Sequence, residues 1–128
     1  MKYDEPVSEK LFQAKVMQIA AMYGWRQAHF RPSLTSNGRW LTAMSGDAGY
    51  PDLTLAHPTK GIIFAELKTD TGRVSKEQDL WHKYLHAGAW VGTSVQLWRP
   101  QQLDEITSML HEGLRRQTPV HGEADRAP

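Results

Sequence analysis

Residues 49–68 read GYPDLTLAHPTKGIIFAELK, and this segment determines the centre of the fold. Two runs rich in strand-forming residues, 52–57 and 61–68, are separated by a short segment, 58–60, that is typical of a turn. The pattern predicts a β-hairpin. Because the second run is apolar at both alternating sets of positions, we expect it to form a central strand that is covered on both faces.

Two charged residues, Glu66 and Lys68, interrupt this apolar strand. They are two positions apart, so their side chains lie on the same face of the sheet. If the hairpin is symmetric about Thr59, Asp52 lies directly opposite Glu66, with Cβ atoms roughly 4.5–5.5 Å apart. Two carboxylates at that distance repel each other unless a cation lies between them. A hard divalent cation such as Mg²⁺ is bound in this way, by one or two carboxylates together with waters and phosphate oxygens.

The same residues also allow an ordinary structural interpretation. Glu66 and Lys68 could form a salt bridge on an edge strand, with Asp52 capping a turn after Pro51. A slip of one residue in the register would move Asp52 to the other face of the sheet. The apolar surroundings of Glu66 on both sides favour the metal site, because a buried carboxylate needs a partner.

Hydrophobic periodicity and turn residues predict the remaining elements. We expect helices over 8–23, over 75–87 and from residue 100 onward, strands over 25–30 and 90–98, and a long loop over 31–49. With the hairpin, this gives an α/β chain in the order α-β-β-β-α-β-α. We expect one domain over residues 1–116 and a disordered tail over 117–128, where apolar residues become scarce.

Composition limits the classes of protein to which the chain can belong. It has 128 residues, enough for one domain, with 15 Lys and Arg against 14 Asp and Glu and a net charge of +1. This balance excludes a polybasic arm or an acidic tail protein. There is no cysteine, which excludes disulfides and thiolate metal sites. The sequence also offers no secretory signal and no apolar run that could span a membrane, so we expect a cytoplasmic protein.

The motifs along the chain resemble those of a known nuclease family. Pro51-Asp52, thirteen intervening residues and then Glu66-Leu67-Lys68 look like the signature of the PD-(D/E)XK nuclease superfamily. The segments after it resemble the VRR-NUC (virus-type replication-repair nuclease) family, and they are Ser75-Lys76-Glu77-Gln78, Leu80-Trp81, Ala87-Gly88-Ala89 and Trp98-Arg99-Pro100. The resemblance covers about residues 8–110.

The resemblance implies a restriction-endonuclease-like core, with a mixed central sheet flanked by helices, and Mg²⁺- or Mn²⁺-dependent hydrolysis of DNA. The implied metal ligands are the carboxylates of Glu9, Asp52 and Glu66 and the backbone carbonyl of Leu67. The implied catalytic residues are Asp52, Glu66, Lys68 and Gln78. Members of such families include phage and bacterial enzymes that cut branched DNA, such as a Holliday junction or a flap, and some act as homodimers.

Two of these residues have alternative explanations. Glu9, which falls near the apolar stripe of the first helix, is also well placed to stabilise that helix through its dipole. Gln78 forms a capping box with Ser75, which would occupy its amide at the start of a helix. The capping and active-site roles of Gln78 are compatible.

Basic and aromatic residues near this site are the candidate DNA contacts, since such side chains bind phosphates and stack on bases. They are Arg31, Arg39, Trp40, Arg73 and Lys76. A non-catalytic nucleic-acid-binding module with the same fold, or a subunit of a replication or repair complex, is the alternative to a nuclease.

Overall fold

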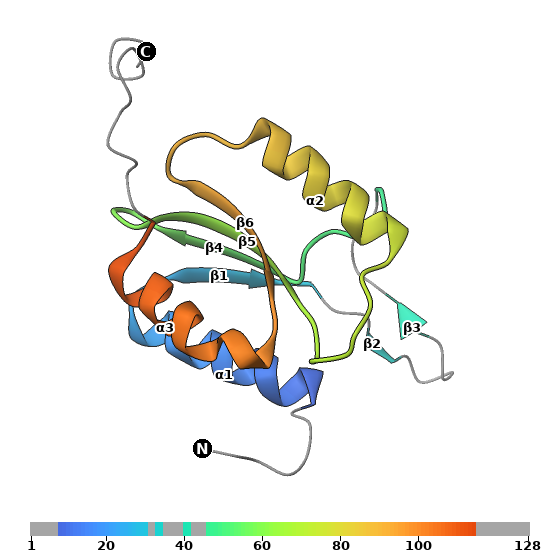
Figure 1. The fold of residues 1–128 in the computed structure, drawn as a ribbon, viewed down its shortest axis with the longest axis horizontal. Coiled ribbons are helices and arrows are strands. Elements are labelled where there is room, and N and C mark those ends of the chain that lie inside the picture. The colour runs from blue at the N-terminus through green and yellow to red at the C-terminus, as the bar shows by residue number, and fades with distance from the viewer. Residues whose placement is uncertain (1–7, 31–32, 35–39, 42–45, 115–128) are drawn as a thin grey trace.

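The computed structural model describes residues 8–30, 33–34, 40–41 and 46–114 (Figure 1). The helices are α1 (Glu9–Met22), α2 (Lys76–Gly88) and α3 (Leu103–Glu112), with a short 3-10 helix η1 (Pro100–Gln102) before α3. The strands are β1 (Arg26–His29), β2 (Ser33–Leu34), β3 (Trp40–Leu41), β4 (Leu53–His57), β5 (Gly61–Leu67) and β6 (Thr93–Trp98). The predicted tail over 117–128 lies outside the described residues.

A four-stranded mixed sheet, in the order β1-β4-β5-β6, forms the centre of the fold. β4 pairs antiparallel with β1 and β5, and β6 runs parallel to β5. In the hairpin, Leu53 pairs with Ala65 and His57 with Gly61. This is the predicted register about Thr59, and continuing it by one position places Asp52 opposite Glu66.

The predicted mixed α/β class is confirmed, and the observed order of elements differs slightly from the predicted one. β2 and β3 form a separate two-stranded sheet inside the segment predicted to be a loop. Each strand has only two residues. A strand this short carries no alternating pattern, which needs at least four residues to be recognised.

The hydrophobic core lies between the sheet and the helices α1 and α3, which pack together on one face (Figure 1). β5 contributes Ile63, Ala65 and Leu67 to this core, all fully buried. The apolar stripe predicted for the first helix is confirmed, because Phe12 and Val16 are buried there. Ser8 caps α1 by accepting a hydrogen bond from the Leu11 amide (3.1 Å), which satisfies one of the free donors of the first turn.

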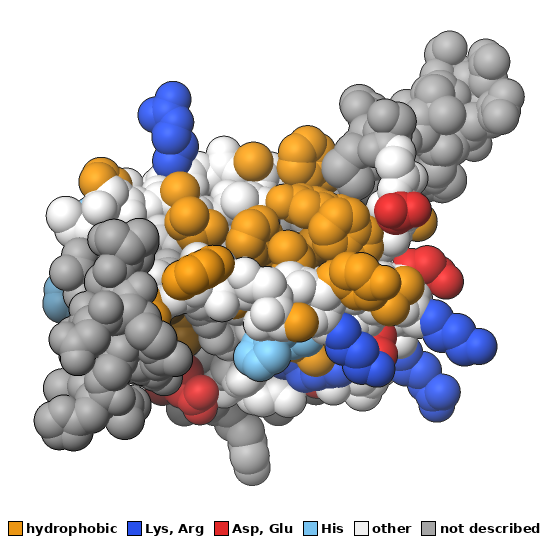
Figure 2. Space-filling view, turned by 90° about the horizontal axis from the view of Figure 1, so that it is seen from above, with side chains coloured by type: hydrophobic (Ala, Val, Ile, Leu, Met, Phe, Trp, Pro, Cys, Tyr) orange, Lys and Arg blue, Asp and Glu red, His pale blue; other side chains and the backbone are white. Residues whose placement is uncertain are grey.

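The opposite face of the sheet, on the side of α2, is only partly covered. α2 has no buried residue, and Ile62 on β5 is 41% exposed. The expectation that β5 is covered on both faces is therefore wrong. Charged and polar residues make up most of α2, so the helix lacks an apolar stripe wide enough to seal the sheet. Figure 2, which views the molecule from this side, shows the hydrophobic side chains that remain exposed.

Candidate metal and catalytic site

Asp52 and Glu66 lie at one end of the central hairpin, just before β4 and near the end of β5. Glu66 is only 6% exposed. Asp52 accepts a hydrogen bond through Oδ2 from the backbone amide of Leu67 (2.8 Å). This bond ties Asp52 to the residue next to Glu66, so the backbone fixes how the two carboxylates are placed.

Asp52 and Glu66 are largely buried, and their carboxylates repel each other when both are charged. Burial, followed by the negative charge of Asp52, raises the pKa of Glu66 from 4.5 to about 8, against the opposing effect of Lys68. Burial also raises the pKa of Asp52, although the Leu67 amide and the charge of Lys68 lower it. Without another cation, Glu66 therefore holds a proton at neutral pH.

The two oxygens of Glu66 have different surroundings. Oε2 accepts a hydrogen bond from the side-chain amide of Gln78 and lies 3.7 Å from Nζ of Lys68. Oε1 is buried, and no donor among the described residues reaches it, although a protonated Glu66 shares a hydrogen bond with the carboxylate of Asp52. A buried carboxylate oxygen without a partner costs free energy, so it calls for a proton or a cation.

The structure confirms the capping box of Gln78, and the same side chain also contacts Glu66. Its Oε1 accepts from the Ser75 backbone amide (2.9 Å), and its own backbone amide donates to the Ser75 hydroxyl (3.1 Å), which completes the capping box. Its Nε2 remains free to donate to Glu66. The start of α2 is thus joined directly to the carboxylate pair.

Arg99 holds the loop that follows Lys68. Its Nη1 donates to the carbonyl oxygens of Thr69 (2.6 Å) and Gly72 (2.8 Å). Arg99 belongs to the Trp98-Arg99-Pro100 motif, and in the structure it is a loop anchor. Such charge-assisted bonds are among the stronger hydrogen bonds in proteins.

Two residues close to the site, Gln13 and His29, were not among the predicted site residues. Gln13 is a buried polar residue of α1, and its Nε2 lies 3.1 Å from Nδ1 of His29. The charge of His29 in turn lowers the pKa of Asp52. The sequence offers one signal for Gln13, which is a polar residue directly beside the apolar Phe12 on α1.

Glu9 departs from the expectation for the first helix. It is exposed, not buried on the apolar stripe, because it is the first residue of α1 and the buried residues of this helix begin at Phe12. Its charge nevertheless contributes to the raised pKa of Glu66. No group of three or more His, Asp or Glu side chains in the described part of the chain is arranged to hold a metal ion.

A magnesium or manganese ion fits the residues that are present. The two carboxylates supply hard oxygen ligands, no donor among the described residues reaches Oε1 of Glu66, and Mg²⁺ requires no more than one or two carboxylates from the protein. A cation would also relieve the repulsion that raises the pKa of Glu66. Asp52 and Glu66 are therefore the residues that could hold it, beside the backbone of Leu67.

Comparisons with protein-family models, curated proteins and solved structures found no match to this chain. The site and its chemistry thus rest on the residues themselves. Within the described part of the chain, no helix is long and apolar enough to cross a membrane.

The structure describes only some of the predicted DNA contacts. Arg73 and Lys76 lie near the start of α2, close in sequence to Gln78, and both are exposed. The backbone of Trp40 belongs to β3. Arg31 and Arg39 lie outside the described residues.

Proposed function

We propose that this chain is a Mg²⁺- or Mn²⁺-dependent DNA endonuclease that hydrolyses phosphodiester bonds, with branched DNA such as a Holliday junction or a flap as its substrate. The observation that carries the proposal is the buried carboxylate pair of Asp52 and Glu66, with Lys68 on the same face and a Glu66 oxygen that no donor among the described residues reaches. The resemblance of these residues to the PD-(D/E)XK signature supports the same activity.

Each residue of the site has a distinct part in this proposal. Asp52 and Glu66 hold the cation, and the Leu67 carbonyl is a further ligand. When bound, the cation polarises the phosphoryl oxygen and lowers the pKa of a bound water. Gln78 fixes the orientation of Glu66 through its amide.

Lys68 is the one cation close to the carboxylate pair among the described residues of β5 and the loop after it. In the proposed reaction its ammonium group orients the attacking water or stabilises the negative charge that develops on the phosphate. Arg99 supports this role indirectly, since it fixes the loop that begins immediately after Lys68.

The near-zero net charge of the chain means that DNA affinity must come from a local patch, to which Arg73 and Lys76 belong. We further propose that two copies act together, because a symmetric dimer would present one site to each strand. Sedimentation of the protein with and without a branched DNA would measure this association.

The test is cleavage of labelled four-way junction, flap, duplex and single-stranded DNA in Mg²⁺, Mn²⁺ or EDTA. We expect metal-dependent cutting by the native protein and none by the Glu66→Ala variant. Binding without any cutting would instead indicate a nucleic-acid-binding module or a subunit that needs a partner protein.

A further inference from the structure

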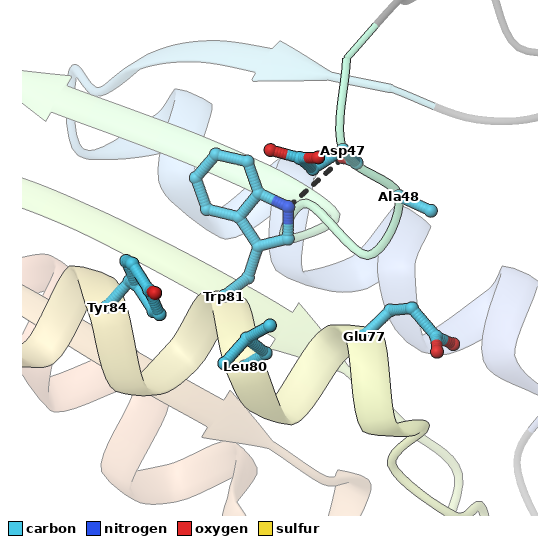
Figure 3. Close-up of a pocket in the computed structure, with 6 residues that line it drawn as sticks. All are labelled: Asp47, Ala48, Glu77, Leu80, Trp81 and Tyr84. Carbon is cyan, nitrogen blue, oxygen red and sulfur yellow. Dashed lines mark hydrogen bonds between the residues drawn. The ribbon is translucent and has the colours of Figure 1, made fainter.

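A hollow of about 350 Å³ opens between α2 and the loop that leads into β4. The described residues that line it are Asp47, Ala48, Glu77, Leu80, Trp81 and Tyr84 (Figure 3). Four of them come from successive turns of α2, and the other two come from the loop that leads into β4. The volume falls within the range of roughly 300–1,000 Å³ that is typical of small-molecule sites.

The hollow is tied to the carboxylate site by the backbone. Gly49 has a φ of +96°, and a Cβ there would lie 2.4 Å from the carbonyl carbon of Glu77, so the loop rests directly on the first turn of α2. The same loop continues to Asp52, and the residue after Glu77 is Gln78, which contacts Glu66. The loop and the helix that border the hollow are therefore the same two segments that carry Asp52 and Gln78.

The indole of Trp81 is held in place before any ligand binds. Its Nε1 donates to the carbonyl oxygen of Asp47 (3.1 Å; Figure 3), and its ring meets that of Tyr50 edge to face, with centroids 5.1 Å apart. Tyr84 and Leu80 stand beside it on α2 and are 73% and 56% exposed. An indole held in this way loses little conformational freedom when a flat ring stacks on it.

The charges that line the hollow decide which part of a nucleic acid can enter it. Asp47 and Glu77 are both acidic, and no Lys or Arg is among its described lining residues. Two carboxylates repel a phosphate but accept hydrogen bonds from the exocyclic amino groups of bases, as a Glu or Asp does with cytosine. The hollow thus suits an uncharged aromatic ring that carries an amino group.

We propose that this hollow binds one unpaired nucleobase of the substrate, with preference for an amino-bearing base over thymine. The inference rests on the proposed nuclease function and narrows its substrate to DNA with an unpaired nucleotide near the cut. Tyr84, Leu80 and Trp81 supply the stacking surface, and Asp47 and Glu77 accept from the amino group. Arg73 and Lys76 lie outside the hollow and bind the phosphates of the strand.

The test is fluorescence anisotropy in EDTA, which removes the metal ions that cleavage requires. The probes are single strands of about 12 nucleotides, a length within the range that one nucleic-acid-binding fold covers. The probes are oligo-dC, oligo-dT and an abasic strand of the same length. We expect the native protein to bind oligo-dC more tightly than the abasic strand by roughly 5- to 150-fold, the effect of stacking one base on an aromatic side chain. Oligo-dT should bind between the two.

Tyr84→Ala should remove most of the difference between oligo-dC and the abasic strand, while Tyr84→Phe, which keeps the ring, should preserve it. The matched control is Trp90→Ala, since Trp90 is 78% exposed beyond the end of α2 and does not line the hollow. Glu77→Gln should reduce the preference for oligo-dC over oligo-dT, and it should not weaken binding of the abasic strand, because it removes a negative charge that repels phosphates.

Equal binding of oligo-dC and the abasic strand by the native protein would overturn the inference. The inference would also be overturned if Tyr84→Ala and Trp90→Ala lost equal affinity for oligo-dC and both changed the sedimentation of the protein. That result would make this face a contact between copies of the chain. Metal-dependent cleavage of branched DNA, measured in parallel, separates the two proposals. If cleavage persists while the base preference is missing, only the inference about the hollow fails.

Discussion

Replacing Glu66 with glutamine should change how the stability of the metal-free protein depends on pH. The pKa of Glu66 in the folded protein is about 8, above its ordinary value of 4.5. The folded protein therefore binds this proton more tightly than the unfolded chain does. The resulting stabilisation is complete below pH 4.5 and is lost as the pH rises through about 8.

The size of the effect follows from the raised pKa. A rise from 4.5 to about 8 corresponds to an upper limit of roughly 5 kcal/mol, at about 1.4 kcal/mol for each pH unit. Asp52 interacts with the same proton, so we expect the loss to stay below that limit. For a domain of this size, it lowers the Tm on the order of 10 °C between pH 5 and pH 9. The glutamine side chain of the Glu66→Gln variant cannot ionise, so the variant should lack this part of the decrease.

The assay is thermal unfolding followed by circular dichroism in EDTA, at intervals from pH 5 to pH 9. Glu105→Gln, which removes an exposed carboxylate on α3, is the matched control. Addition of Mg²⁺ at pH 8 should raise the Tm of the native protein and leave that of Glu66→Gln nearly unchanged, because a ligand that binds only the folded state stabilises it. Parallel curves for the native protein and Glu66→Gln would refute the reasoning, since Glu66 would then hold no proton that a cation could replace.

Four further substitutions test the remaining contacts. Lys68→Ala should slow cleavage with metal binding largely kept, and a calorimetric titration that shows loss of Mn²⁺ binding would contradict this role. Arg99→Ala should lower the free energy of unfolding by about 2–3 kcal/mol in urea, since two loop carbonyl groups lose a charged donor; an unchanged midpoint would argue against the loop anchor. Ser75→Ala should lower the free energy of unfolding by about 1 kcal/mol, because the helix cap is lost, and should leave the cleavage rate unchanged. Gln78→Ala should also lower the cleavage rate, because the amide contact with Glu66 is lost. Equal cleavage by these two variants would limit Gln78 to capping.

The central hairpin could be predicted in detail because its pattern is local. A short turn fixes the register of two adjacent strands, and that register alone brings Asp52 opposite Glu66. The alternation of side chains along a strand then places Lys68 beside Glu66. The apolar stripe of α1 follows from helical spacing in the same way.

Features that depend on tertiary packing could not be predicted. The contact between Gln13 and His29 joins α1 to β1, and nothing in either segment specifies the other. The sequence of β5 does not reveal that α2 leaves Ile62 exposed, since apolar residues on both faces are also found in a fully covered strand. Glu9 is exposed because it is the first residue of α1, whose buried residues begin at Phe12, and helical periodicity does not define which turn of a helix reaches the core.

The most direct test of the central claim is single-turnover cleavage of a labelled branched DNA by the Asp52→Asn protein in Mg²⁺. DNA binding by anisotropy in EDTA and the Tm of the variant serve as controls for folding. If Asp52 and Glu66 hold the cation together, the variant binds this DNA with nearly native affinity and does not cut it. Mg²⁺-dependent cleavage by Asp52→Asn at a rate close to that of the native protein would contradict the account.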